Sequence, residues 1–237
     1  MFAREEVCPA RENFQLIPIP IVQLRKYRLF SGHLDWCLLD VVSAPRFVFT
    51  ILRHPIERIL SFYFYLRFKA ATLSAEALQA RENQGLNAAL NLTPDEYFSG
   101  GMPGLRQFID DHYDNFYSYY FCGRSFNARH KLRSIMTRQN SDLSEDRIVD
   151  IAIENLREID RVYTTHDLDR LEADVRTALG APAAPATLSG LHINKGDGDL
   201  DSRLQMLRDL GASERTYTRL EQMTAMDNRI WKIFSGK

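Results

Sequence analysis

The chain has 237 residues and a formal net charge of −1 at pH 7, with 45% hydrophobic and 26% charged residues. This length suits one domain with a sizeable core, and the balanced charge excludes a broad basic surface for nucleic acid or anionic lipid. Three scattered cysteines exclude a disulfide framework or a zinc site, and no apolar run reaches the ~20 residues of a membrane span. We therefore expect one soluble, cytoplasmic domain over residues 1–237, in which any anion site is local.

The residues before position 46 predict short elements. Two prolines within residues 14–25 favour an irregular lead-in over a helix interior or a central strand. Residues 27–31 predict a short strand that ends, after a glycine turn, at His33, and residues 35–42 predict a helix. A lone histidine near a glycine is most often a surface residue, but a neutral imidazole near pH 7 also suits proton removal from a hydroxyl.

Residues 46–68, RFVFTILRHPIERILSFYFYLRF, predict a strand, a tight turn and a helix. The run FVFTIL is typical of a parallel strand buried on both faces, and Pro55 suits the first position of a helix. Arg53 then lies at the carboxyl end of the strand, where open α/β sheets bind ligands. Its planar guanidinium suits an oxyanion, and Ser61 adds a hydroxyl. The alternatives are an ion pair between Arg53 and Glu57 and a plain surface hydroxyl at Ser61.

The spacing of this segment matches a known pattern, Arg-x-Pro-x-x-Arg with a Ser eight residues after the first Arg: Arg53, Pro55, Arg58 and Ser61. It resembles the 3′-phosphate-binding segment of sulfotransferases that use 3′-phosphoadenosine 5′-phosphosulfate (PAPS). The carbohydrate group that includes heparan sulfate 2-O-sulfotransferase is the most similar. The resemblance implies that Arg53 and Ser61 hold the 3′-phosphate. Arg58 is expected to form a structural ion pair.

The same resemblance implies roles for two further residues. The Gly32-His33 pair is similar to a pair upstream of this segment in uronyl 2-O-sulfotransferases, which implies that His33 is the catalytic base. A late glycine-containing loop closes over the 3′ side of the nucleotide in sulfotransferases, and Lys195 is the matching cofactor contact.

One part of the family pattern is absent from the sequence. These enzymes begin with a strand and a phosphate loop of the Pro-Lys-x-x-Gly-Thr-Ser kind, whereas the first lysine here is Lys26 and the first glycine is Gly32. We therefore expect an α/β, P-loop-like three-layer domain whose central parallel sheet lacks its first strand and phosphate loop. The chain resembles an amino-terminally truncated enzyme, and a missing amino terminus can hide a signal or an anchor.

The middle of the chain predicts helices. Residues 70–103 predict a helical insertion or lid over the sheet edge, with a solvated helical hairpin as the alternative. Within them, Thr93-Pro94-Asp95-Glu96 indicates the start of a helix. Residues 114–123 predict buried aromatic packing. The basic stretch 124–138 suits either an anionic saccharide or a solvated helix face.

The last third alternates helix and strand, as α/β sheets do. A capping signal at Ser141 or Ser144 opens a helix to residue 159. A strand at RVYTTHD and a helix that stops at Gly180 follow, and residues 201–234 predict two more helices.

Together these features predict a sulfotransferase that moves a sulfuryl group from PAPS to a hydroxyl, most simply on a carbohydrate, without a metal ion. The alternative is an inactive remnant of such an enzyme that binds 3′-phosphoadenosine 5′-phosphate (PAP) or another partner. A P-loop kinase relative is disfavoured because the sequence lacks the Lys-Ser/Thr pair of that fold.

Overall fold

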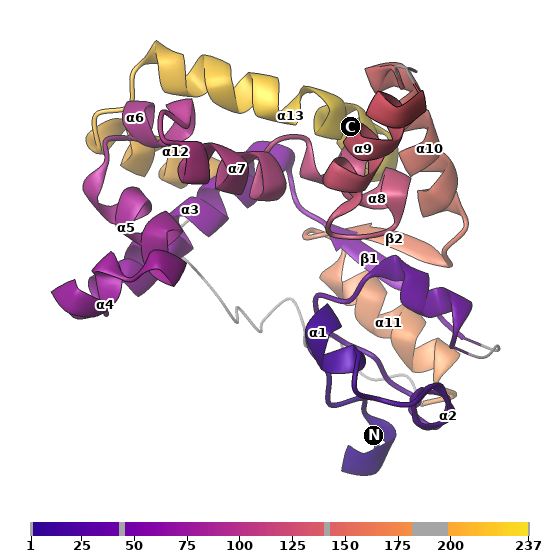
Figure 1. Cartoon of the computed structure of the whole chain (residues 1–237). Helices are drawn as coiled ribbons and strands as arrows, with labels where there is room; N and C mark the ends of the chain where they lie inside the picture. The colour runs from indigo at the N-terminus through magenta and orange to yellow at the C-terminus, as the bar shows by residue number, and fades with distance from the viewer. Residues whose placement is uncertain (1, 43–45, 140–142, 182–198, 237) are drawn as a thin grey trace.

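The computed structural model describes residues 2–42, 46–139, 143–181 and 199–236. The chain is mostly helical and contains a two-stranded parallel sheet (Figure 1). The elements before the sheet are short: η1 (Arg4–Glu6), α1 (Asn13–Leu16), α2 (Ile21–Leu24) and η2 (Trp36–Asp40). The helices between the two strands are α3 (Pro55–Ala71), α4 (Ala75–Gln79), η3 (Arg81–Asn83), α5 (Gln84–Asn91), α6 (Pro94–Ser99), α7 (Pro103–His112), α8 (Phe116–Gly123), α9 (Ala128–Gln139) and α10 (Glu145–Arg157). Those after the sheet are α11 (Leu168–Ala178), α12 (Leu200–Asp209) and α13 (Glu214–Ser235).

The sheet pairs β1 (Phe49–Leu52) with β2 (Arg161–Thr164) in parallel, so that Leu52 lies beside Thr164. Figure 1 shows α8 and α10 on one side of these strands and α11 on the other. This arrangement, mostly helical with a small parallel sheet, is compatible with a broadly α/β fold. The expectation that the first strand is buried on both faces is wrong, because Leu52 is fully buried while Phe49 and Ile51 are 39% and 41% exposed. Leu52 packs into the core with α8 and α10, whereas α11 packs against β2.

The predicted strand at residues 27–31 is also wrong. Leu29 and His33 form only isolated bridges, with Val7 and Glu12 respectively. The backbone of this segment bonds to residues 6–8: Cys8 N, for example, donates to the Leu29 carbonyl at 2.8 Å. The segment therefore makes isolated parallel bridges to the amino-terminal residues instead of joining the sheet. The helix expected at residues 35–42 is the 3₁₀ helix η2.

The expected local signals elsewhere are present. Pro55 occupies the first position of α3, and the residue before it is extended. Thr93 and Glu96 form a reciprocal capping box at the start of α6. Ser144 caps α10 by accepting a hydrogen bond from Arg147 N at 3.2 Å. These signals work because they involve residues within one turn of each other.

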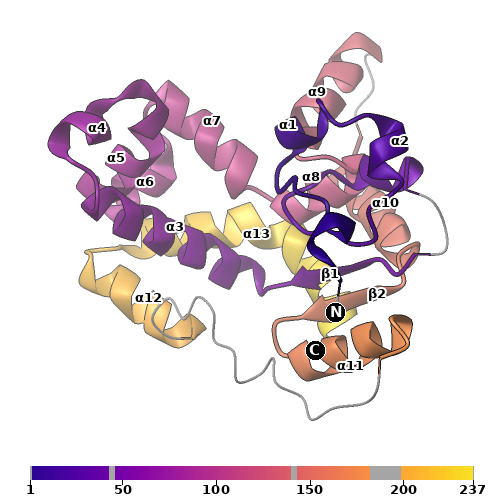
Figure 2. The same cartoon turned by 90° about the horizontal axis from the view of Figure 1, so that it is seen from below.

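Two hydrophobic cores share the last helix. Helices α3, α5, α6, α7 and α12 form the first core, which α13 completes with Leu220 and Met223. Strand β1, α8 and α10 form the second, which α13 completes with Met226 and Ile230. Figures 1 and 2 show α13 beside α3 and reaching the sheet, with α4 to α7 grouped along α3 and away from β1. The segment at residues 70–103 thus contributes to a core along α3.

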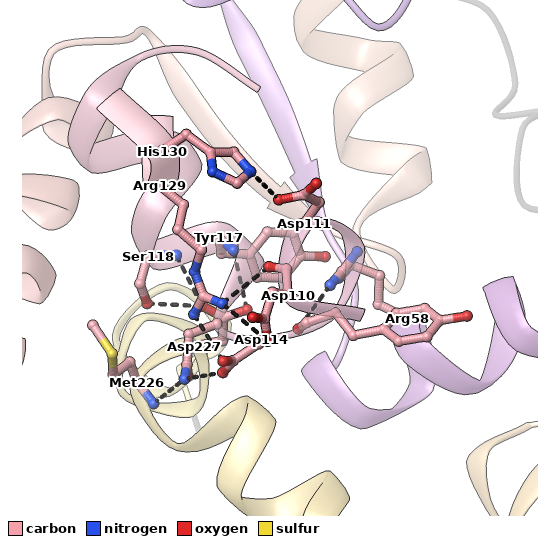
Figure 3. Close-up of polar contacts among 12 residues, drawn as sticks. Arg58, Asp110, Asp111, Asp114, Tyr117, Ser118, Arg129, His130, Met226 and Asp227 are labelled. Atoms are coloured by element: carbon pink, nitrogen blue, oxygen red, sulfur yellow. Dashed lines mark hydrogen bonds and ion pairs between the residues drawn. The ribbon is translucent and has the colours of Figure 1, made fainter. Parts of the chain in front are cut away.

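A buried carboxylate lies where α13 passes from one core to the other. Asp227 is 1% exposed and accepts hydrogen bonds from Tyr117 N at 3.0 Å, Ser118 N at 2.8 Å and Ser118 Oγ at 2.7 Å (Figure 3). The two amide donors belong to the first turn of α8, where backbone N–H groups lack partners within the helix. Asp227 therefore fixes the start of α8 against α13.

We expect Asp227→Asn to lower the free energy of unfolding by about 1–3 kcal/mol, because the amide nitrogen meets a backbone donor and leaves it unpaired. Urea denaturation measures the change. Glu221→Gln, which removes a carboxylate from an exposed position of the same helix, is the control, and its effect should stay within about 0.5 kcal/mol. Equal stability of both variants would show that the α8 start does not depend on the buried charge.

Candidate functional site

The site is built around Arg53, in the two-residue turn between β1 and α3. Leu52 anchors the strand end in the core, and Pro55 starts the helix. Tyr117 from α8 holds the backbone of the turn: its hydroxyl accepts a hydrogen bond from Arg53 N at 3.0 Å and donates one to the Arg53 carbonyl at 3.2 Å. The Tyr117 side chain thus replaces the partners that a neighbouring strand would supply to this residue.

The Arg53 side chain reaches Ser61, the second residue of the predicted anion site. Its Nη1 donates a hydrogen bond to Ser61 Oγ at 2.7 Å, across two turns of α3. The Arg53 side chain keeps a third of its surface exposed, and Ser61 is half-buried. The two residues singled out from the sequence therefore lie together, and the Arg53 side chain is partly open to solvent.

Glu57 is the carboxylate next to this pair. Its Oε1 lies 3.6 Å from Arg53 Nε and 3.0 Å from Nη1 of Arg203, which belongs to α12. The first distance is an ion pair without a hydrogen bond, and the second is a hydrogen-bonded ion pair. The sequence alternative for Arg53, a pair with Glu57, is present as the longer of these two contacts.

Among the residues that the structure describes, no carboxylate forms the ion pair with Arg58 that was expected from the sequence. Arg58 Nη2 donates to the carbonyls of His112 at 2.8 Å and Tyr113 at 3.3 Å, and its guanidinium lies 4.5 Å from the centre of the Phe116 ring. These carbonyls end α7, so Arg58 joins the end of one helix to the beginning of the next. An arginine that packs on a ring and binds carbonyls has a structural role.

The basic stretch at residues 124–138 is paired with carboxylates at the positions that Figure 3 shows. Arg129 is 5% exposed, and its Nη2 lies 2.8 Å from Asp114 Oδ2. His130 Nε2 lies 2.6 Å from Asp111 Oδ1. These contacts favour a structural role for this part of the stretch over binding of an anionic saccharide.

His33 is exposed, and its backbone N donates to the Arg11 carbonyl at 2.7 Å. Its neighbours Gly32 and Leu34 line a cavity of about 220 Å³ together with residues 48–50 at the beginning of β1. Arg53 follows the opposite end of that strand. Within the described ranges, no hydrogen bond or ion pair joins the His33 imidazole to the Arg53 group, so its role as a base stays a prediction.

Lys195, the remaining predicted contact, lies outside the described residues. A second cavity, of about 600 Å³, lies between α5 and α7 and is lined by amide side chains such as Asn87 and Asn91. Neither Arg53 nor Ser61 lines either cavity. The chemistry of the strand end, not the cavity volume, therefore identifies the candidate site.

Sequence reasoning missed three residues that build the site: Tyr117, Arg203 and Asp227. For two of them the sequence contained a pattern that could have indicated the role. Asp227 lies on the apolar face of α13 with Met223 and Ile230, and Arg203 lies between buried or half-buried leucines of α12. A charged residue on an apolar helix face indicates a buried ion pair or cap.

Comparison of the chain with protein-family models, curated proteins and solved structures found no match. Among the described residues, no group of three or more His, Cys, Asp or Glu side chains is arranged to hold a metal ion. In the same part of the chain, no helix combines the length and apolar character that crossing a bilayer requires.

We expect Tyr117→Phe to lower the free energy of unfolding by about 1–3 kcal/mol, because the Arg53 N–H and carbonyl both lose a partner in a half-buried turn. Tyr119→Phe in the same helix is the control, since its hydroxyl makes no hydrogen bond within the described ranges. Urea denaturation of both variants gives the comparison, and equal losses would show that the bonds to Arg53 contribute nothing specific.

Proposed function

We propose that the chain binds the 3′-phosphate of PAPS through Arg53 and Ser61 and transfers the sulfuryl group to a hydroxyl of a carbohydrate. The observation that supports this proposal most is the 2.7 Å hydrogen bond between Arg53 Nη1 and Ser61 Oγ at the end of β1. Because Ser61 accepts this bond, its own proton remains for a phosphate oxygen. The guanidinium has further donors for the same anion.

The position of the pair also favours an anion. It lies where a parallel strand leads into a 17-residue helix, and the beginning of a helix carries a positive partial charge. With this site we propose the finer fold class as well, a P-loop-like three-layer domain around a central parallel sheet. The similarity of the Arg53–Ser61 spacing to that of PAPS-dependent enzymes is the reason for choosing a nucleotide 3′-phosphate over other anions.

In the proposed reaction, PAPS supplies the sulfuryl group and PAP leaves. An acceptor oxygen forms a new bond to sulfur as the bond from sulfur to the 5′-phosphate oxygen breaks. His33 accepts the proton of the acceptor hydroxyl, while Arg53 and Ser61 hold the opposite end of the nucleotide in register.

Binding of PAP without turnover is the second candidate. One observation favours it: the 237 residues contain no Pro-Lys-x-x-Gly-Thr-Ser segment, which holds the 5′-phosphosulfate in the enzymes that the chain resembles. Both candidates share the Arg53–Ser61 site, and only the first requires His33.

We expect Arg53→Ala to weaken PAP binding roughly ten- to a hundredfold, because a charge-assisted hydrogen bond contributes ~1.5–3 kcal/mol. Binding of adenosine 5′-monophosphate, which lacks the 3′-phosphate, should change little. Calorimetry with both nucleotides measures the difference.

Arg170→Ala removes an exposed arginine from α11 and serves as the control for a change in net charge. If Arg53→Ala weakens both nucleotides equally, the assignment of the 3′-phosphate to Arg53 is wrong.

Where the chain transfers sulfate from labelled PAPS to a polysaccharide, we expect His33→Ala to lower turnover by about 10²–10⁴-fold, since general-base catalysis typically contributes that much. PAP affinity should stay unchanged, because His33 does not contact Arg53. His166→Ala, which removes an exposed histidine in the loop after β2, is the control. Undiminished turnover in the His33 variant would remove it from the base role.

A further inference from the structure

The carboxylate of Glu57 raises an electrostatic difficulty for the proposed anion site. Glu57 lies in the first turn of α3, and its Oε1 is 3.6 Å from Arg53 Nε, the guanidinium assigned to the phosphate. A phosphate bound by Arg53 would lie next to a like charge, which opposes binding strongly in a half-buried setting. The same carboxylate can also close on Arg53 and compete with the phosphate for its donors.

Arg203 supplies the compensating charge. Its Nη1 donates a hydrogen bond to Glu57 Oε1 at 3.0 Å, shorter than the Arg53 contact by more than half an ångström. The Arg203 side chain is only 6% exposed and that of Glu57 only 18% exposed, so water screens their attraction weakly. Glu57 is therefore held more closely by Arg203 than by Arg53.

Arg203 reaches Glu57 because of how α12 packs against α3. Arg203 lies on α12, whose Leu207 is fully buried in the core with α3. Figures 1 and 2 both show α12 beside α3. The guanidinium therefore approaches Glu57 from a neighbouring helix, while the exposed side chain of Arg53 keeps its contact with Ser61.

We propose that Arg203 is a positioning residue of the anion site: it neutralises Glu57 and thereby leaves the Arg53 guanidinium available for a nucleotide 3′-phosphate. This inference rests on the proposed function and adds to it a residue that acts without touching the ligand. It implies that Glu57 is inhibitory whenever Arg203 is absent. The effect of Arg203 on binding must then depend on whether Glu57 is charged.

A double-mutant cycle with PAP as the probe tests this dependence. We expect Arg203→Met to weaken PAP binding by roughly ten- to a hundredfold, the effect of leaving one partner of a buried charge pair unpaired. Glu57→Gln should bind PAP at least as tightly as the unchanged chain. The double variant E57Q/R203M should bind within about threefold of Glu57→Gln, since no carboxylate remains to be neutralised.

Three controls separate positioning from a structural role. Arg208→Met removes an exposed positive charge from the same helix and should change PAP affinity less than about threefold. Binding of adenosine 5′-monophosphate should respond weakly to every variant, because it lacks the 3′-phosphate. Urea denaturation reports whether Arg203→Met alters folding. If that variant does not fold, Glu57→Gln with and without R203M still gives the decisive comparison.

The outcomes of these experiments test the positioning role of Arg203 separately from the proposed function on which it rests. A full loss of affinity in E57Q/R203M relative to Glu57→Gln would show that Arg203 contacts the ligand or only supports the fold, and would overturn the positioning role. PAP binding that depends on Arg53 but not on Arg203 would overturn this inference and leave the proposed function intact. Failure of the unchanged chain to bind PAP overturns both.

Discussion

The buried carboxylate of Asp227 is the interaction on which the site depends. It lies at the point where α13 leaves one core and enters the other, and it accepts three hydrogen bonds from the first turn of α8. Burial raises the pKa of Asp227 above its ordinary value, while Arg58 and the hydrogen bonds from Ser118 and Tyr117 oppose that shift. A charge taken out of water is tolerated only when donors surround it in this way.

Tyr117 links Asp227 to the carboxyl end of β1. Asp227 fixes the backbone N–H of this residue, and the hydroxyl of the same residue holds the backbone of Arg53. Arg58 strengthens the arrangement from α3, since it binds the last carbonyls of α7 and packs on Phe116 at the start of α8. The candidate anion site is thus oriented by contacts from helices α8 and α13, both distant from it in the chain.

The arginine side chains of this region differ in exposure, and this difference indicates which of them can bind a ligand. The side chains of Arg129 and Arg203 are both 6% exposed and paired with carboxylates. Arg53 keeps a third of its side-chain surface open, and its hydrogen-bond partner is a neutral hydroxyl. A guanidinium with unused donors and access to solvent is the one suited to an incoming oxyanion, whereas a fully paired buried arginine stabilises the geometry around it.

The sequence by itself determined the elements whose signals lie within a few residues. The change from an apolar run to Pro55 located the turn between β1 and α3, and Thr93 and Ser144 marked the starts of α6 and α10. The spacing of Arg53 and Ser61 resembled that of a phosphate-binding segment, which predicted that the two residues act together, and their side chains do meet. Local hydrogen bonding and helical periodicity suffice for such inferences.

Strand pairing, exposure and ion pairing between residues far apart in the chain were decided only by the tertiary structure. Residues 27–31 have a composition that suits a strand, but their backbone partners are residues 6–8, so they form a bridge outside the sheet. Phe49 and Ile51 belong to an apolar run, yet their exposure depends on which helices pack over β1. The closer pairing of Glu57 with Arg203 than with Arg53 depends on where α12 docks. Burial and long-range charge pairing are properties of packing, which a local pattern does not contain.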